Sequence, residues 1–307
     1  MPERSLADRL DGLLFFPVTA FAPDGGLDTP TFRVHVRQGV AAGAGAVFAA
    51  CGTGEYHALD LDEYEEVVRA AVAEAAGQVP VVAGVGHGTA LAARFAERAE
   101  RAGADGLLAM PPYLVKPDQD GLLRHYRALV EASSLELIVY QRDNAVLTPA
   151  SVVELTGIPA VIGLKDGVGD LELMQRIVSA VRTEVPERPF LYFNGLPTAE
   201  LTGPAYRSIG ISRYSSAVFC FAPDLALAFH RALGSGADET VNRLIDGFYR
   251  PLVELRRLGR GYAVSLVKAG VRLQGLDVGT VRPPLSEPAP EHLKRLAELI
   301  DHGRTLI

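Results

Sequence analysis

Short apolar segments alternate with amphipathic segments along most of the chain. Each apolar segment is bounded by Gly, Pro or Asp and has the length of a buried parallel strand. The segment at 210–216 departs most from this pattern, because its sequence GISRYSS is polar. The alternation predicts strands over 13–21, 46–51, 79–86, 106–112, 135–141, 161–167, 190–195 and 210–216.

The segments between the apolar runs have the periodicity of amphipathic helices. Two begin with recognisable start signals, Asp60 before one segment and Thr148-Pro149 at the start of another. The predicted helices are 28–43, 60–76, 89–102, 119–132, 149–156, 170–183, 198–207 and 223–233. Eight strand–helix units predict an α/β protein with a closed (β/α)8 TIM barrel.

The rest of the chain, 236–307, has no strand pattern. Its apolar positions predict helices near 236–258, 262–274 and 290–303, and Arg282-Pro283-Pro284 indicates a connector. We therefore expect residues 1–235 to form the barrel and 236–307 to form a C-terminal helical extension. The extension is expected to pack on the barrel within a single structural unit.

Composition and charge exclude several classes of protein. The formal net charge of −7 gives no reason to expect a nucleic-acid partner. No apolar run has the length of a membrane span, and residues 1–8 lack the apolar core of a signal peptide. Cys51 and Cys220 have neither metal-site nor disulfide-framework spacing. These features favour a cytoplasmic protein with no membrane segment.

A lysine inside an apolar predicted strand is the first candidate for chemistry. Lys165 lies in VIGLKDGVGD, near the strand end where barrel enzymes carry their catalytic groups. Burial disfavours an ammonium group, and a neutral amine can condense with a ketone to form an imine. Alternatively, Lys165 is a structural residue paired with Asp166 or with a carbonyl oxygen. The pattern by itself favours neither interpretation.

Polar residues at other predicted strand ends are further candidates. Tyr140 ends LELIVYQ and could relay protons during imine formation, or it could be a packed aromatic residue. Gly52, Thr53 and Gly54 follow the second strand. Their N–H groups and the Thr53 hydroxyl could hold a carboxylate, or the glycines could simply form a tight turn.

Asn194, Ser215 and Ser216 end the last two predicted strands. Their side chains are candidates for hydrogen bonds to substrate, although turn formation and capping explain them equally well. The chain has no metal-ligand spacing of histidines or carboxylates, no dinucleotide or phosphate-binding glycine motif and no GxSxG motif. We therefore expect neither a metal nor an organic cofactor.

Taken together, three segments resemble the dihydrodipicolinate synthase / N-acetylneuraminate lyase superfamily. They are Gly-Thr-Gly-Glu at 52–55, the tyrosine that ends the fifth strand, and Gly-Leu-Lys-Asp at 163–166. The resemblance covers nearly the whole chain and implies a class I, Schiff-base barrel enzyme that acts on 2-oxo acids. By position, it implies that Lys165 forms the imine, Tyr140 relays protons, and Thr53 binds a carboxylate with the 52–53 backbone. It also implies a homodimer or homotetramer.

Departures from the dihydrodipicolinate synthase pattern bear on the reaction. Gly52 stands where that enzyme has the first of two threonines, and Ala145 stands where it has an arginine. Pro112-Tyr113-Leu114 keeps one of its two tyrosines. These losses remove that enzyme's proton relay and its clamp for a second carboxylate, so we do not expect synthesis of dihydrodipicolinate.

Four segments resemble instead the 5-dehydro-4-deoxyglucarate dehydratases of the same superfamily: FFPVTAF, ACGTGEYHALDLDEY, VYQRDNAVLTP and GLKDGVGD. This resemblance implies that 5-dehydro-4-deoxy-D-glucarate, a sugar acid, is converted to 2,5-dioxopentanoate, water and CO2. Candidates for contacts with the substrate hydroxyls and the distal carboxylate are Arg142, Asn144, Asn194, Ser215 and Ser216.

Two alternatives stay open. One is a 2-oxo-acid aldolase of the same superfamily, which would release pyruvate. The other is a non-catalytic barrel that binds a sugar acid. In addition, Cys220 lies in SSAVFCF, where the resemblance leads us to expect an asparagine.

Overall fold

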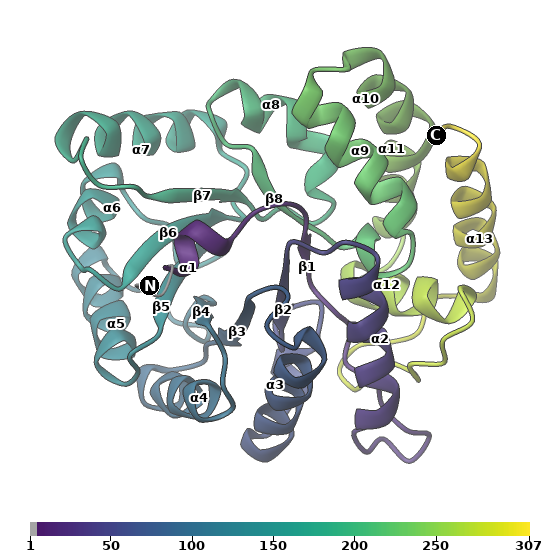
Figure 1. Ribbon diagram of the computed structural model, residues 1–307, viewed down its shortest axis with the longest axis horizontal. Helices are drawn as coiled ribbons and strands as arrows, with labels where there is room; N and C mark the ends of the chain where they lie inside the picture. The colour runs from purple at the N-terminus through teal and green to yellow at the C-terminus, as the bar shows by residue number, and fades with distance from the viewer. Residues whose placement is uncertain (1–4) are drawn as a thin grey trace.

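A computed structural model describes residues 5–307. The expectation that there is no signal peptide rests partly on residues 1–4, which lie outside the described residues. Parallel strands close into a barrel in the order β1 to β8, and most of the helices surround it (Figure 1). This confirms the predicted (β/α)8 barrel. No helix within 5–307 is long and apolar enough to cross a membrane.

All eight predicted strands are present, and each is shorter than the apolar run that predicted it. The polar strand β8 is explained by its position, because Ser216 is buried and donates a hydrogen bond to Glu200. The strands are β1 Leu14–Phe15, β2 Ala46–Ala49, β3 Val81–Val85, β4 Gly106–Ala109, β5 Glu136–Gln141, β6 Val161–Asp166, β7 Leu191–Asn194 and β8 Arg213–Ser216.

The helices of the barrel follow the sequence pattern closely. Asp60 and Glu63 form a capping box at the start of α3, and Thr148 caps α6, as their positions predicted. The predicted helix 198–207 is divided into η2 and α8, because Pro204 starts a new helix. The elements are α2 Thr29–Ala41, η1 Tyr56–Ala58, α3 Leu61–Ala75, α4 Thr89–Arg101, α5 Gln119–Glu131, α6 Pro149–Thr156, α7 Leu171–Glu184, η2 Ala199–Thr202, α8 Gly203–Ser208, η3 Val218–Cys220 and α9 Pro223–Ser235.

One short helix, α1 (Leu6–Arg9), was not predicted, because four residues are too few to show a helical period. Its Leu6 belongs to the apolar cluster that fills the barrel interior, together with Leu14, Phe48 and Phe193. A second and larger apolar cluster lies between the barrel and its helices. Among the described residues, the barrel interior is therefore a packed core that α1 covers at the N-terminal end of the strands.

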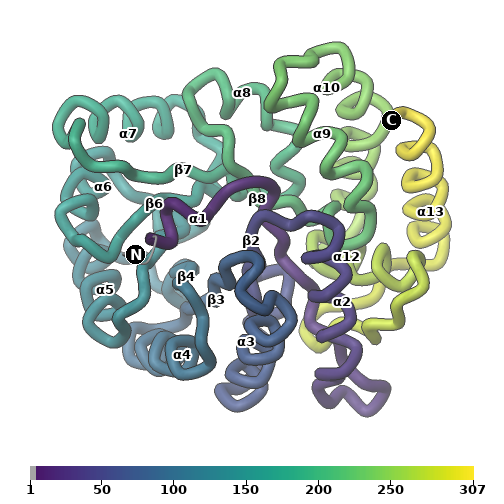
Figure 2. The backbone as a smooth tube through the Cα atoms, viewed as in Figure 1, coloured from purple at the N-terminus to yellow at the C-terminus, as the bar shows by residue number. Residues whose placement is uncertain are grey.

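The helices after α9 are α10 Asp238–Leu244, the π-helix η4 Ile245–Tyr249, α11 Arg250–Arg256, α12 Tyr262–Leu273 and α13 Pro290–Arg304. The helix predicted over 236–258 is interrupted by η4 because Pro251 lacks the amide hydrogen that the α pattern needs. α12 packs against η3, and α13 packs against α9, α11 and α12. These helices lie together at one side of the barrel (Figure 2).

Candidate active site

Lys165 and Tyr140 lie side by side at the C-terminal ends of β6 and β5, where the strand register pairs them. Lys165 is only 5% exposed, and its Nζ lies 3.8 Å from the centroid of the Tyr140 ring. Both side chains donate to the carbonyl oxygen of Gly195, Lys165 Nζ at 3.4 Å and Tyr140 Oη at 2.9 Å. The two residues that the sequence singled out for catalysis are therefore in direct contact.

The carboxylate of Asp166, the neighbour of Lys165 in sequence, points away from this contact. It accepts hydrogen bonds from Gln141 Nε2 at 2.8 Å, from the N–H groups of Val168 and Gly169, and from the Tyr206 hydroxyl. Because these donors occupy both of its oxygens, Asp166 is not the partner of Lys165. Of the two structural pairings considered for the lysine, only the contact with a carbonyl oxygen is present.

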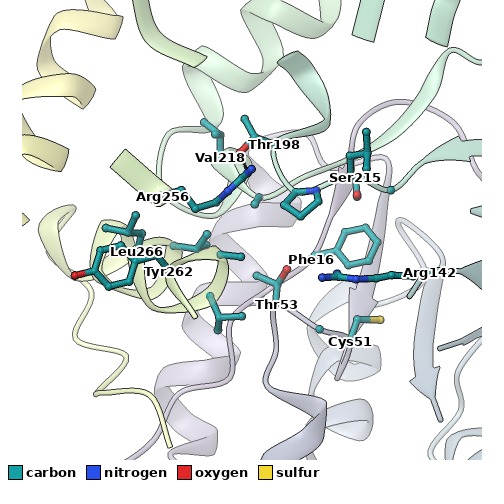
Figure 3. A pocket seen from close by; sticks show the side chains of 18 of the residues that line it. Phe16, Cys51, Thr53, Arg142, Thr198, Ser215, Val218, Arg256, Tyr262 and Leu266 are labelled. Atoms are coloured by element: carbon teal, nitrogen blue, oxygen red, sulfur yellow. Dashed lines mark hydrogen bonds between the residues drawn. The ribbon is translucent and has the colours of Figure 1, made fainter. Parts of the chain in front are cut away.

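A cavity of about 260 Å³ opens at the ends of the strands (Figure 3). Lys165 and Tyr140 are among the residues that line it. The lining includes three basic side chains, those of Arg142, Lys165 and Arg256, and among the described residues no aspartate or glutamate. Such a cavity favours an anionic ligand. The predicted site residues that line it are Gly52, Thr53, Tyr140, Arg142, Lys165 and Ser215.

Gly54 and Asn144 hold loops in place and do not line the cavity. The carbonyl oxygen of Gly54 accepts a hydrogen bond from the Thr19 hydroxyl at 2.6 Å. Asn144 Nδ2 donates to the carbonyl oxygens of Pro112 at 2.9 Å and Val115 at 2.5 Å, which ties the loop after β5 to the loop after β4. Gly54 thus lies beside the cavity-lining Thr53, and Asn144 lies in the loop after β5, but neither contributes to the lining itself.

Asn194 and Ser216 are buried behind the cavity wall. Asn194 Nδ2 donates to the carbonyl oxygen of Ala199 and to the Thr202 hydroxyl, and its Oδ1 accepts from the N–H of Leu196. Ser216 donates to Glu200 at 2.5 Å. These bonds are the turn and capping contacts that were the alternative interpretation of both residues.

The helices after the barrel supply one wall of the cavity, which no strand-end motif could have predicted. Arg256 at the end of α11 is the charged member of this wall. Its Nη1 donates to the Thr198 hydroxyl at 2.5 Å. The residues from this part of the chain are Leu252, Arg256, Tyr262, Ala263, Val264, Leu266, Val267 and Leu296.

A buried ion pair fixes the loop that carries Gly52 and Thr53. Glu55 Oε1 lies 2.8 Å from Nζ of Lys268 on α12, and both side chains are 0% exposed. The backbone N–H of Arg282 donates to Glu55 Oε2, also at 2.8 Å. The sequence signal for this pair is Lys268 itself, because it lies within the apolar run of a predicted helix and a buried ammonium group needs a partner there.

The two cysteines are buried thiols. Cys51 lines the cavity, and burial raises its pKa to about 12, so it is not a nucleophile at neutral pH. Cys220 lies in η3 and donates to the carbonyl oxygen of Phe16 at 3.0 Å; it does not line the cavity. Within residues 5–307, no group of His, Cys, Asp and Glu side chains is arranged to hold a metal ion.

Glu200 is a buried carboxyl group next to this site. Burial raises its pKa to about 7, and the hydrogen bond from Ser216 and the charge of Arg256 oppose that shift. Its Oε2 has no hydrogen-bond partner in the described residues, and the hydroxyls of Tyr214 and Tyr249 close by have none either. Below about pH 7, the native state therefore favours the protonated carboxyl over the carboxylate.

We expect Glu200→Gln to weaken the pH dependence of stability. The native Glu200 carboxyl keeps a proton up to about pH 7 that the unfolded chain releases near 4.5, so the free energy of unfolding falls as pH rises through this range. The fall between pH 5 and pH 8 should be smaller in the variant by about 2–3 kcal/mol. Urea unfolding at several pH values measures it.

His35 also makes the stability of the protein depend on pH. Burial lowers its pKa to about 4, so its contribution is lost as pH falls below 6.5, the opposite direction. Because both proteins contain His35, this contribution cancels in the difference between them. Equal slopes for the two proteins would show that Glu200 is ionised in the native state.

Comparison with known proteins gives the same family throughout. The model of the dihydrodipicolinate synthetase family matches residues 9–303. A protein of Streptomyces avermitilis named "Probable 5-dehydro-4-deoxyglucarate dehydratase 1" is 69% identical, over 100% of this chain and 99% of its own length. A "Probable 5-dehydro-4-deoxyglucarate dehydratase" of Streptomyces griseus is 68% identical, over 100% and 97%.

Solved structures agree with the sequence comparisons. The crystal structure of dihydrodipicolinate synthase from Bacillus clausii superposes with a TM-score of 0.88 at 26% identity, covering 96% of this chain and 98% of that one. The superposition extends over the helices after the barrel as well as the barrel itself. The chain therefore belongs to the dihydrodipicolinate synthetase family, and to the group within it whose members are named probable 5-dehydro-4-deoxyglucarate dehydratases.

Proposed function

We propose that this protein is a Schiff-base-forming lyase, a decarboxylating dehydratase. It converts 5-dehydro-4-deoxy-D-glucarate to 2,5-dioxopentanoate, water and CO2. The observation that carries the proposal is the contact of Lys165 with Tyr140, in a cavity whose charged lining residues, among those described, are all basic. A dianionic 2-oxo acid matches that charge, and the names of the relatives in Streptomyces support this substrate.

Binding begins at the ketone end of the substrate. The C6 carboxylate, next to the ketone, lies on the Thr53 hydroxyl and the backbone of Gly52 and Thr53. The Lys165 amine attacks C5, and the carbinolamine loses water to give an iminium. Tyr140 donates and accepts the protons of these steps, since its hydroxyl and the lysine Nζ share the carbonyl oxygen of Gly195.

The iminium then drives the elimination of water. It acidifies C4, which loses a proton to give an enamine. The electron pair of the enamine forms a C3=C4 double bond as the C3–OH bond breaks, and the hydroxyl leaves as water. Arg142 and Ser215, which line the cavity, are proposed to hold the substrate hydroxyls.

Loss of CO2 uses the same electron sink. The C3=C4 bond is conjugated with the iminium, so breaking the C1–C2 bond moves its electron pair through C2=C3 and C4=C5 to the lysine nitrogen. Protonation, tautomerisation of the C2 enol to an aldehyde, and hydrolysis of the imine release 2,5-dioxopentanoate. One lysine thereby serves both bond-breaking steps.

The products test this proposal. Protein mixed with 5-dehydro-4-deoxy-D-glucarate should release CO2 and 2,5-dioxopentanoate in equal amounts, without pyruvate. Pyruvate without CO2 would identify the aldolase alternative. Tight binding with no product of either kind would identify a barrel that only binds sugar acids.

We expect Tyr140→Phe to slow turnover by about 10²–10⁴-fold, the usual contribution of a positioned acid–base group. The variant keeps the ring that Lys165 contacts and removes only the hydroxyl. The rate of borohydride-trapped imine formation should fall with the turnover number. Trapping at the wild-type rate would show that another group relays the protons.

Three further features complete the proposal. The protein works in the cytoplasm, where its buried cysteines stay as free thiols. It assembles as a homodimer or homotetramer, in keeping with the superfamily it resembles. Asn144, Asn194 and Ser216 support the site from behind, through the hydrogen bonds that occupy their side chains.

A further inference from the structure

Arg256 is a cavity-lining cation that the proposed chemistry at Lys165 does not use. It ends α11 and lines the cavity, and in Figure 3 it lies above Thr53 whereas Arg142 lies to the right of Thr53. The two arginines therefore reach the cavity from different directions. A six-carbon diacid anchored through its ketone at Lys165 has a second carboxylate at its far end, which needs a cation of its own.

The guanidinium of Arg256 is held in place but lacks a carboxylate partner in the cavity. Its Nη1 donates to Thr198 Oγ1 at 2.5 Å, which uses one of the five N–H donors of an arginine. No acidic side chain lines the cavity within the described chain. Burial lowers the pKa of Arg256, as do the charges of Arg257 and Arg142, whereas the Glu200 carboxyl outside the cavity lining opposes this shift. An anionic ligand would stabilise this buried positive charge by pairing with it.

The residue that positions Arg256 has a strained backbone. Thr198 has φ 56° and ψ 61°, in the left-handed region that a β-branched residue rarely adopts. It is buried and lies in the loop after β7, immediately before η2. Such strain persists only where the surrounding structure imposes it, and it is typical of ligand-binding sites. Here it directs the hydroxyl toward Arg256.

Arg142 is less suited to the distal carboxylate. Its Nε already lies 3.1 Å from a carboxylate oxygen of Asp143. It also follows Tyr140 by two residues, so it belongs to the wall near the ketone end. Arg256 comes instead from the helices after the barrel and approaches the cavity beside the loop after β7.

We propose that Arg256, oriented by Thr198, binds the distal C1 carboxylate of the diacid, the group that leaves as CO2. The inference rests on the proposed function, because Lys165 must anchor the other end of the substrate. Arg256 then selects diacids over 2-oxo acids that lack a second carboxylate. All the candidates that the sequence predicted for this carboxylate lie in the barrel, at 142–216, whereas Arg256 lies on α11.

The test compares Arg256→Met with Arg257→Met, which removes the same charge from an exposed neighbouring position. Each protein is incubated with 5-dehydro-4-deoxy-D-glucarate or with pyruvate, which has no distal carboxylate. Borohydride then traps the imine at Lys165, and mass spectrometry gives the ligand concentration for half-maximal trapping. Release of CO2 from the diacid is measured in parallel.

We expect Arg256→Met to raise the half-maximal concentration of the diacid at least about 30-fold, the effect of removing one partner of a buried charge pair. The value for pyruvate should stay within about twofold of wild type, and Arg257→Met should change neither. The same shift for both ligands, or none for the diacid, would overturn the inference.

The same experiment tests the proposed function independently of the role of Arg256. Diacid trapped by the wild-type protein without release of CO2 would refute the proposed reaction, while the shift in Arg256→Met would still support the carboxylate subsite. No trapping of either ligand by the wild-type protein would refute both.

Discussion

Replacing Lys165 with methionine is expected to lower kcat/KM for the diacid by at least about 10³-fold, because the covalent route through the imine is lost. Methionine has a similar length and is apolar, so it suits the aromatic surroundings of Nζ formed by Phe16 and Tyr140. The folded structure should therefore survive the change. Steady-state turnover measures the effect, with the thermal midpoint as a check on folding.

The matched control is Lys116→Met, which changes an exposed lysine in the loop after β4. It should turn over substrate at the wild-type rate and should still form the trapped adduct at Lys165. If Lys165→Met kept more than about a tenth of wild-type activity, the amine would not be the group that forms the covalent intermediate.

The second large effect concerns stability. Lys268→Met should lower the free energy of unfolding by about 3–5 kcal/mol, because it leaves the Glu55 carboxylate buried without its cation. The backbone N–H of Arg282 remains as a donor to Glu55, but it carries no charge. Urea unfolding at neutral pH measures the loss.

The double variant Glu55→Gln/Lys268→Met tests whether the loss of stability comes from the unpaired Glu55 charge or from damage to the packing. With both charges removed, most of the lost stability should return, since the buried ion pair costs desolvation that it only partly regains. Lys294→Met is the control, since its exposed partner Glu298 lies 3.8 Å away and the change should cost less than about 1 kcal/mol. If Lys268→Met and Lys294→Met lost the same free energy of unfolding, Glu55 would not be a buried carboxylate that depends on Lys268.

The barrel could be predicted because local patterns determine its elements. Apart from β8, each strand is an apolar run that is buried between the barrel interior and the surrounding helices, and caps such as Asp60 mark where helices begin. Lys165 stood out for a related reason, since a charged side chain within an apolar strand contradicts the pattern around it. Its contact with Tyr140 follows from the register of two adjacent parallel strands.

The rest of the site depends on contacts between distant parts of the chain. Arg256 looks like an ordinary surface arginine in sequence, beside Arg257, and only the packing of α11 brings one of the two to the cavity. Asn194 does not line the cavity, because its amide hydrogen-bonds to the backbone of the turn that follows it. The position of a residue at a strand end therefore predicts where its Cα atom lies. The direction of its side chain depends on which nearby groups it hydrogen-bonds.

The most direct test of the central claim is borohydride trapping during turnover of 5-dehydro-4-deoxy-D-glucarate, followed by mass spectrometry of the peptide that contains Lys165. We predict adducts on Lys165 that correspond to the substrate and to the substrate after loss of water and CO2. A pyruvate-derived adduct, an adduct on another lysine, or turnover with no adduct at all would contradict the proposed function.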